Sequence, residues 1–188
     1  TGAVSIDSNA SITDGASGID AFSNTGAITI DQAAATLITA ADHGIVAEST
    51  STGTVSVTNA ATINADLAAG GAYGINAINN GVGSVFVSNS GAIFGGADRG
   101  ISAFKNGGGA GTVSVINSGA LGTAGNPVDL SGIVAVASSG ASTGAVTVGN
   151  TGSINASLSG IVSNNLGSGV STVTNSGAIT AVAVGISS

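Results

Sequence analysis

Cysteine, methionine and tryptophan are absent from this sequence, and charged residues make up only 6% of it. Without cysteine the chain has no disulfide, no thiol chemistry and no cysteine-ligated metal. Two basic residues, Arg99 and Lys105, stand against nine acids, for a formal net charge of −7. Such a chain has no basic surface to neutralise phosphates, so we expect no nucleic-acid partner.

Long hydrophobic runs are also lacking, although 43% of the residues are hydrophobic. The longest mostly apolar run, Ala178 to Ile186, is shorter than the roughly 18 residues of a spanning helix, so we expect no membrane-spanning segment. Glycine is frequent but does not recur at every third position, which excludes a collagen triple helix. The apolar content is too high for an intrinsically disordered chain.

Three landmarks recur in a fixed order along the chain. The first is an alternating pair of aliphatic residues, at Val4/Ile6, Ile28/Ile30, Val55/Val57, Val85/Val87, Val113/Val115, Val146/Val148 and a degenerate Ser171/Val173. The second is a single aliphatic residue, usually six positions later, at Ile12, Ile63, Ile93, Leu121, Ile154 and Ile179, with Ile38 displaced by two. The third is a Gly-Ile pair, at Gly18-Ile19, Gly44-Ile45, Gly74-Ile75, Gly100-Ile101, Gly132-Ile133, Gly160-Ile161 and Gly185-Ile186.

Successive Gly-Ile pairs lie 26, 30, 26, 32, 28 and 25 residues apart. Each unit therefore holds three apolar segments that are too short for helices and that alternate with a period of two. Three strands per unit make one coil of a solenoid, whose equivalent strands stack in register about 4.8 Å apart. We predict an all-β fold, a right-handed parallel β-helix of about seven coils with three short strands each.

The alternation also predicts which side chains point into the coil. Val55 and Val57 should face inward and Ser56 outward, while Ile75 and Ala77 face inward on the third strand. A small residue recurs at this last position, at Ala21, Ala47, Ala77, Ala103, Ala135 and Ser163. We expect a narrow place in the interior there, where a bulky side chain does not fit.

An asparagine follows the first strand of five coils, at Asn59, Asn89, Asn117, Asn150 and Asn175. Stacked inward asparagines can bond their amides to the turn backbone and to one another, so we predict a structural ladder. Ligand contact is the alternative role for these amides. Ser/Thr-Gly follows four of them, and we interpret this glycine as the supplier of a positive φ at the corner.

Residues for catalysis or metal binding are scarce and scattered. The only histidine, His43, adjoins Asp42, but neighbouring strand residues point to opposite faces and the pair precedes the turn at Gly44, so we expect a solvated loop. The calcium-binding pattern Gly-Gly-x-Gly-x-Asp does not occur. The stretch from Gly107 to Gly111 lacks the lysine and helix start of a phosphate loop, and we expect a flexible turn. We predict no enzyme, no cofactor and no metal site.

Two outward rows are candidates for contact with a partner. One follows the Gly-Ile pairs, at Phe22, Glu48, Ile78, Phe104, Val136 and Asn164, and its apolar members Phe22, Ile78, Phe104 and Val136 form a possible interaction surface. The alternative is that the chain turns there and buries them. The other row lies on the first strand, at Ser5, Thr29, Ser56, Phe86, Ser114, Thr147 and Thr172. It could order water or dock a sugar, or it could be an ordinary exposed strand.

Two coils carry longer connections between their second and third strands, at Asp66 to Ala72 and at Gly122 to Asp129. Insertions on one face of a solenoid are common places for binding differences, and they can equally be neutral.

The units Thr52-Gly-Thr-Val-Ser-Val-Thr-Asn59, Gly111-Thr-Val-Ser-Val-Ile-Asn-Ser-Gly119 and Thr143-Gly-Ala-Val-Thr-Val-Gly-Asn-Thr-Gly152 are each followed by Gly-Ile. They resemble the passenger repeats of bacterial autotransporter adhesins. The resemblance covers nearly the whole chain and implies export to the bacterial outer surface or secretion, with roles in cell adhesion, aggregation or fibre formation. The sequence departs from that family's pattern because it holds no segment resembling the outer-membrane translocator barrel.

Two functions follow as expectations. In the first, the chain is a structural protein of an extracellular fibre or stalk that associates end to end. In the second, it is an adhesin passenger that binds a cell-surface protein or glycan. Both terminal sequences, Thr1 to Val4 and Val184 to Ser188, look like ordinary coil sequence rather than polar caps. We therefore expect residues 1–188 to be one β-helix segment, uncapped at both ends and part of a longer chain or filament.

Overall fold

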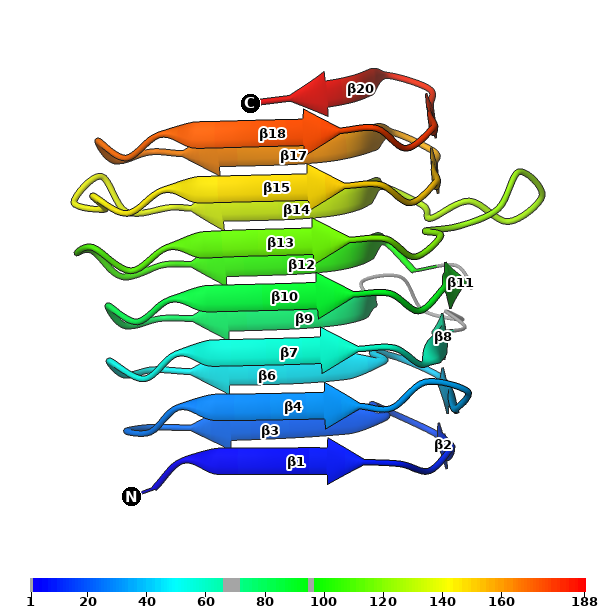
Figure 1. Cartoon of the computed structure of the whole chain (residues 1–188), viewed down its shortest axis with the longest axis horizontal. Coiled ribbons are helices and arrows are strands. Elements are labelled where there is room, and N and C mark those ends of the chain that lie inside the picture. The colour runs from blue at the N-terminus through cyan, green and yellow to red at the C-terminus, as the bar shows by residue number, and fades with distance from the viewer. Residues whose placement is uncertain (1, 66–71, 95–96) are drawn as a thin grey trace.

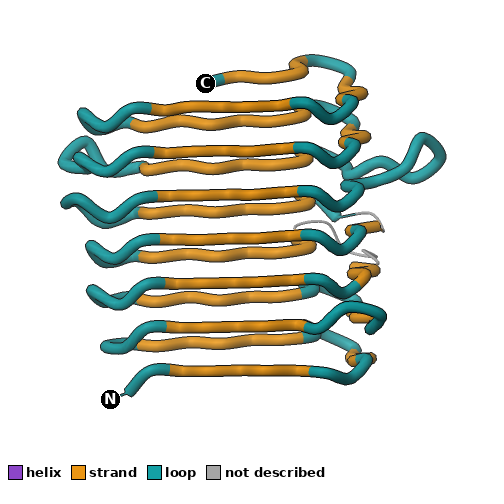
Figure 2. Tube along the Cα trace, in the orientation of Figure 1, coloured by secondary structure: helices purple, strands orange, loops and turns teal. Residues whose placement is uncertain are grey.

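The computed structural model describes residues 2–65, 72–94 and 97–188. Throughout these residues the regular elements are β-strands, and all the strand pairs are parallel. The chain winds through about seven turns that stack on one another as a β-solenoid, as Figures 1 and 2 show. The predicted all-β, coiled architecture is confirmed.

Two broad sheets form the long sides of every coil. Sheet A contains the first strand of each coil, β1 (Val4–Ser8), β4 (Ile28–Gln32), β7 (Val55–Asn59), β10 (Val85–Asn89), β13 (Val113–Asn117), β15 (Val146–Asn150) and β18 (Ser171–Asn175). Sheet C contains the third strand, β3 (Ile19–Ser23), β6 (Ile45–Ser49), β9 (Tyr73–Asn79), β12 (Arg99–Lys105), β14 (Ser131–Ala137), β17 (Ser159–Asn165) and β20 (Val184–Ser187).

A narrow strip closes the third side of the coil. Its strands are β2 (Ile12–Asp14), β5 (Leu37–Ala40), β8 (Thr62–Ala65), β11 (Ile93–Phe94), β16 (Ile154–Ala156) and β19 (Ile179–Ala181). In the fifth coil single bridges from Leu121 to Ile93 and Ile154 continue this strip. The three sides are therefore unequal, with two long sides and one short side. Ile38 still pairs in register with Ile12 and Ile63.

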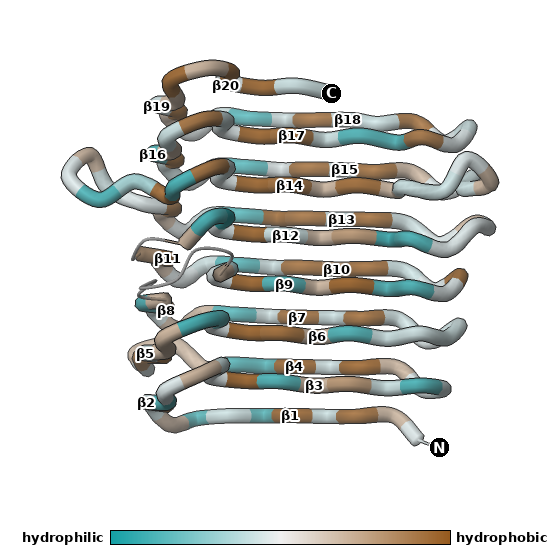
Figure 3. Tube along the Cα trace, turned by 180° about the vertical axis from the view of Figure 1, so that it is seen from behind, coloured by the Kyte–Doolittle hydropathy of each residue, from teal (hydrophilic) through white to brown (hydrophobic). Residues whose placement is uncertain are grey.

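The core is a set of columns in which each apolar residue lies against its counterpart in the next coil. Val55, Val57, Ile75 and Ala77 are fully buried, as the alternation predicted. Figure 3 shows the hydrophobic stretches of successive coils lying above one another. Each buried aliphatic side chain contributes about 1.5–3 kcal/mol relative to its exposed state, so the repeated columns supply the main driving force for the stack.

The small-residue column on sheet C is buried throughout, and its members pair in register. Its one serine explains the degenerate first strand of the last coil. Ser163 and Ser171 approach each other with 2.8 Å between their hydroxyl oxygens. A serine at each position lets the two hydroxyls satisfy one another inside the coil, where an isolated hydroxyl would be costly.

The predicted asparagine ladder is confirmed. Each inward amide nitrogen donates to the side-chain oxygen of the asparagine in the next coil, over distances of 2.7–2.8 Å from Asn59 through Asn175. Each also donates to the carbonyl oxygen two residues further along its own turn, as Asn89 does to Gly91 at 2.8 Å. Asn59, Asn89, Asn117 and Asn150 are buried, which fits a structural role.

The interpretation of the glycines that follow these asparagines was wrong. Positive φ angles among glycines of the described residues occur at Gly109 and Gly122, not at Gly91, Gly119, Gly152 or Gly177. Close approach of the coils requires glycine instead. A Cβ on Gly119 would lie 1.9 Å from the carbonyl oxygen of Gly91, and one on Gly152 would lie 2.0 Å from that of Gly119.

The first and last coils are less buried than those between them. Val4, Ile6, Ile12, Val173 and Ile179 pack against the core but are only partly buried, because each has a neighbouring coil on one side. Among the described residues there is no helical segment with the length and hydrophobicity that spanning a bilayer requires.

Candidate interaction surface

The predicted apolar row lies on the outward face of sheet C. Parallel pairing places its members, Phe22, Glu48, Ile78, Phe104, Val136 and Asn164, in one column, one residue per coil. The side chain of Phe22 is 53% exposed, and Ile78, Phe104 and Val136 are half-buried. These side chains are therefore not tucked into the coil.

Glu48 interrupts this column between Phe22 and Ile78. Its carboxylate accepts a hydrogen bond of 2.7 Å from the side-chain amide of Asn80. The continuous apolar part is therefore the run of Ile78, Phe104 and Val136 across three adjacent strands, which we call the apolar run. Phe22 stands apart from it, near one end of the solenoid.

A second column on this sheet brings together residues that are far apart in the sequence. The residue before each Gly-Ile pair is His43, Tyr73 and Arg99 in three successive coils, and these are the only histidine, the only tyrosine and the only arginine. The rings of His43 and Tyr73 stack with centroids 5.1 Å apart and planes 29° from parallel. The guanidinium carbon of Arg99 lies 5.5 Å from the Tyr73 ring centroid.

Arg99 joins this column to the apolar run. Its guanidinium carbon lies 5.9 Å from the ring centroid of Phe104, five residues further along β12. The side chain therefore extends along the strand toward Phe104. We call His43, Tyr73, Arg99 and Phe104 the Arg99 platform.

Sequence reasoning named Phe104 as part of an interaction surface but did not connect it to Arg99 or Tyr73. The signal that could have found this link is the residue in front of each Gly-Ile pair. Read in coil order it is Ser17, His43, Tyr73, Arg99, Ser131, Ser159 and Val184. Three large, chemically distinct side chains thus follow one another in an otherwise mostly small column.

His43 lies in a loop before Gly44, as expected, but its imidazole makes specific contacts and is not fully solvated. Its Nδ1 accepts a hydrogen bond from the backbone N–H of Tyr73 at 3.1 Å. The Asp42 carboxylate lies 3.3 Å from the same nitrogen, with side-chain exposures of 22% for His43 and 54% for Asp42. One nitrogen cannot accept from Tyr73 and donate to Asp42 at once, so the Tyr73 bond requires the imidazole proton on Nε2.

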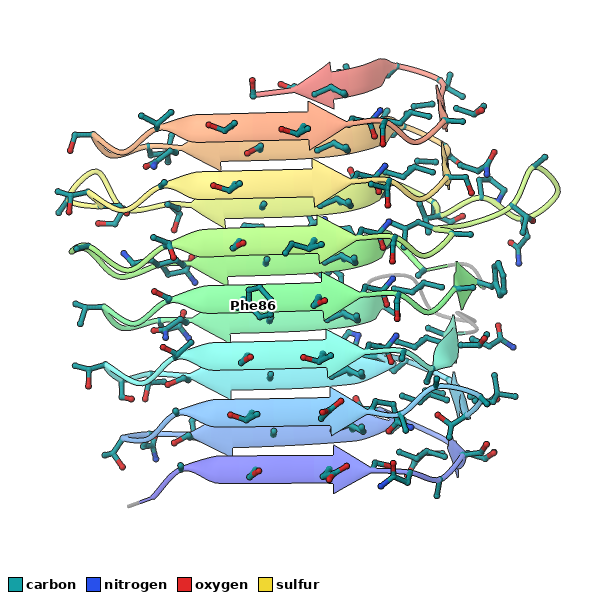
Figure 4. The ribbon with its side chains drawn as sticks, in the orientation of Figure 1. Phe86 is labelled. Atoms are coloured by element: carbon teal, nitrogen blue, oxygen red, sulfur yellow. The ribbon has the colours of Figure 1, made fainter. Side chains whose placement is uncertain are left out.

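The hydroxyl row of sheet A is also a single column, with one interruption. Pairing aligns Ser5, Thr29 and Ser56 on one side of Phe86, and Ser114, Thr147 and Thr172 on the other. Figure 4 shows Phe86 projecting from the face of β10. This ring divides the hydroxyl array into two short parts.

Lys105 is fully buried at the turn between sheets C and A. Its Nζ donates to the carbonyl oxygens of Gly107 and Gly108, and lies 3.4 Å from the hydroxyl of Ser142. Burial lowers the pKa of this ammonium group. The glycine-rich stretch, which we expected to be a flexible turn, therefore wraps a buried cation. Arg99 is the basic side chain that remains at the surface.

The insertion at Gly122 to Asp129 protrudes from the narrow strip, at the right of Figure 1. Backbone hydrogen bonds between Thr123 and Asn126 close its tip. A hollow lies between this loop and the strip, lined by Thr123, Ala124, Pro127, Ala156, Val182 and their neighbours. Of the other insertion, residues 66–71 lie outside the described residues.

Side chains suited to a metal ion do not gather anywhere in residues 2–65, 72–94 and 97–188, where no group of three or more His, Asp or Glu was found. No protein-family model, curated protein or solved structure matches this chain.

Proposed function

We propose that this chain is a structural or interaction protein of the bacterial cell surface or extracellular matrix, and that its coils form a stiff stalk or fibre by end-to-end stacking. The observation that carries the proposal is the constant in-register pairing of the strands from the first coil to the last. Such a stack is extended and stiff, because each coil is held to its neighbours by backbone hydrogen bonds along its sides.

The two terminal coils are complementary to one another. The same register, continued by one step, would place Ile6 on Val173, Ile12 on Ile179 and Ile19 on Ile186. Strands β1 and β18 are at opposite ends of sheet A, and each pairs on one side only. An unpaired, flat strand edge with half-exposed aliphatic residues is a ready template for another strand.

The proposed location at the cell surface or in the extracellular matrix is based on the sequence. The units resemble autotransporter passenger repeats, and the absence of cysteine agrees with that family's composition. A surface with few charges and many hydroxyl and amide groups also suits a protein that assembles through backbone edges.

End-to-end stacking is tested with the 188-residue chain by light scattering and electron microscopy over a concentration series up to low millimolar protein. We expect lengthwise association that increases with concentration. Val173→Lys would place a charge in the buried centre of the junction and should abolish it. Val182→Lys is the matched control, because that side chain is 85% exposed and points away from the core. A monomer at all concentrations, or equal assembly of the two variants, contradicts the proposal.

The alternative is an adhesin passenger that binds a ligand on a host or neighbouring cell. The apolar run and the Arg99 platform favour it, because half-exposed apolar side chains beside a charged group are typical of binding surfaces. Binding of the monomeric chain to cells, reduced by Phe104→Ser and unaffected by Phe86→Ser, would support this function over the stalk.

A further inference from the structure

We propose that the Arg99 platform is a binding site for a sugar that carries a carboxylate group. In this site the guanidinium of Arg99 pairs with the carboxylate, and the sugar ring rests on the apolar run beside Phe104. The inference goes beyond end-to-end stacking and does not depend on it.

Arg99 supplies the positive charge that a carboxylate ligand requires. Lys105 is buried inside the coil, so Arg99 carries the permanent positive charge at the surface. No described carboxylate lies within 4.0 Å of the Arg99 guanidinium; among the described residues, the carboxylate that lies this close to a basic side chain is that of Asp42, beside His43. A ligand carboxylate can therefore form the two parallel hydrogen bonds for which a guanidinium is suited.

The guanidinium of Arg99 is already held in position before a ligand binds. The guanidinium lies near the rings of Tyr73 and Phe104, with centroid distances of 5.5 Å and 5.9 Å, and Tyr73 in turn stacks on His43. Cation–π contacts hold the group in place, so binding a ligand orders little that is not already ordered. An arginine extending into solvent would lose more side-chain entropy.

The shape of the surface selects a sugar over a fatty acid. An acyl chain needs a concave pocket that encloses it, whereas the apolar run is one half-buried column on the face of a sheet. Asn76 lies in the neighbouring outward column, in register with Ser102, and its half-buried amide can bond to a hydroxyl group. The carbon–hydrogen face of a sugar ring can pack on Ile78 and Phe104, while its hydroxyl groups can bond to the Asn76 amide.

The surrounding charge selects a single carboxylate over a polyanion. The whole chain carries −7, and Asp98 directly precedes Arg99 in the sequence. A sulfated or phosphorylated polymer would be repelled by this field over about 8–10 Å. A single carboxylate paired with Arg99 would be repelled only by the acidic groups close to it.

Arg99, His43 and Tyr73 are each the only residue of their type in the sequence, so NMR can follow each of them separately. A chain with one arginine gives one arginine Nε–H signal in a nitrogen–proton NMR spectrum, and His43 and Tyr73 give one set of ring signals each. Glucuronate is titrated into the full chain, and we expect a saturable shift of the Arg99, His43 and Tyr73 signals, with a Kd of about 1 mM. Glucose, the methyl ester of glucuronate, and acetate should each bind at least about tenfold more weakly, which corresponds to about 1.4 kcal/mol.

Variants locate the site. Arg99→Gln should weaken glucuronate binding at least about tenfold, followed on the His43 and Tyr73 signals, and Arg99→Lys should weaken it less, because an ammonium group keeps the charge without the paired donors. Phe104→Leu should weaken binding, whereas Phe86→Leu on the opposite sheet should not. The dispersion of the backbone amide signals checks that each variant is folded.

Several results would overturn the proposal: no shift with glucuronate, equal shifts with glucose or acetate, or unchanged affinity in folded Arg99→Gln. The titration is read at a protein concentration where the chain is monomeric. Failure of end-to-end stacking and failure of sugar binding are therefore seen in different experiments.

Discussion

Asn89 donates its side-chain amide to the side-chain oxygen of Asn117 in the next coil at 2.8 Å, and Asn117 does the same to Asn150 at 2.7 Å. The ladder therefore has a direction, from the N-terminal coils to the C-terminal ones. It begins at Asn59, whose Oδ1 is buried without a described partner. Gln32 in the preceding coil directs its amide to Thr36 and to the carbonyl oxygen of Ala10 instead.

Replacing an interior member of the ladder should destabilise the fold more than replacing its last member. Asn117→Ala removes bonds to Gly119 and Asn150 and leaves the Asn89 amide without its acceptor, all of them buried. We expect a loss of roughly 2–5 kcal/mol in the free energy of unfolding. Asn175→Ala affects half-buried groups and should cost about 1 kcal/mol. Denaturant unfolding measures both, and equal losses would contradict the ladder's role.

The glycine of each Gly-Ile pair should not tolerate a methyl group. A Cβ at Gly74 would lie 2.3 Å from Cγ2 of Ile93 and 2.6 Å from the carbonyl oxygen of Gly100. We expect Gly74→Ala to lower the free energy of unfolding by about 1–3 kcal/mol or more, because both neighbours belong to the packed stack. Gly149→Ala is the control, since nothing lies within 4 Å of its Cβ position, and it should be neutral or stabilising. Thermal unfolding of the two variants compares them directly.

The turn that displaces Ile38 contains a strained residue. Ala35 has a φ of 60°, in the left-handed region that glycine occupies without a Cβ clash. Ala35→Gly should therefore raise the free energy of unfolding by up to about 1 kcal/mol, whereas Ala34→Gly should lower it by about 0.5–1 kcal/mol. Chemical denaturation distinguishes these opposite signs, and a loss of stability in both variants would show that Ala35 is not strained.

Buried Lys105 should make stability depend on alkaline pH. Its pKa is lowered by burial, so between the lowered pKa and lysine's ordinary value the unfolded chain binds more protons than the folded chain. The free energy of unfolding therefore rises with pH across this window, and the penalty is absent above both values. Asparagine occupies the same register in the preceding coil, at Asn79, so Lys105→Asn should fold and should lack this rise. Unfolding measured from neutral to alkaline pH in both proteins checks this, because other groups that titrate there affect both alike.

The coil architecture could be predicted from the sequence because its signals are local and repeated. Inward residues alternate within each strand, and Gly-Ile pairs mark the coil length, so the columns of Val57, Ala77 and Asn89 followed from counting. Stacking in register then places each of these residues against its counterpart in the next coil. Even the displaced Ile38 kept its register, because a misplaced side chain would leave the core.

Only the tertiary structure decided what the outward and turn residues do. The reach of Arg99 across β12 to Phe104, and the stacking of His43 on Tyr73, depend on rotamers and on contacts between coils rather than on spacing along the chain. The same holds for Lys105, whose ammonium folds back into a glycine turn. Close approach of carbonyl groups between coils explains Gly119, where sequence alone suggested a backbone angle. Period and polarity determine which side of a strand a residue occupies, but its partners there are set by the distance between coils.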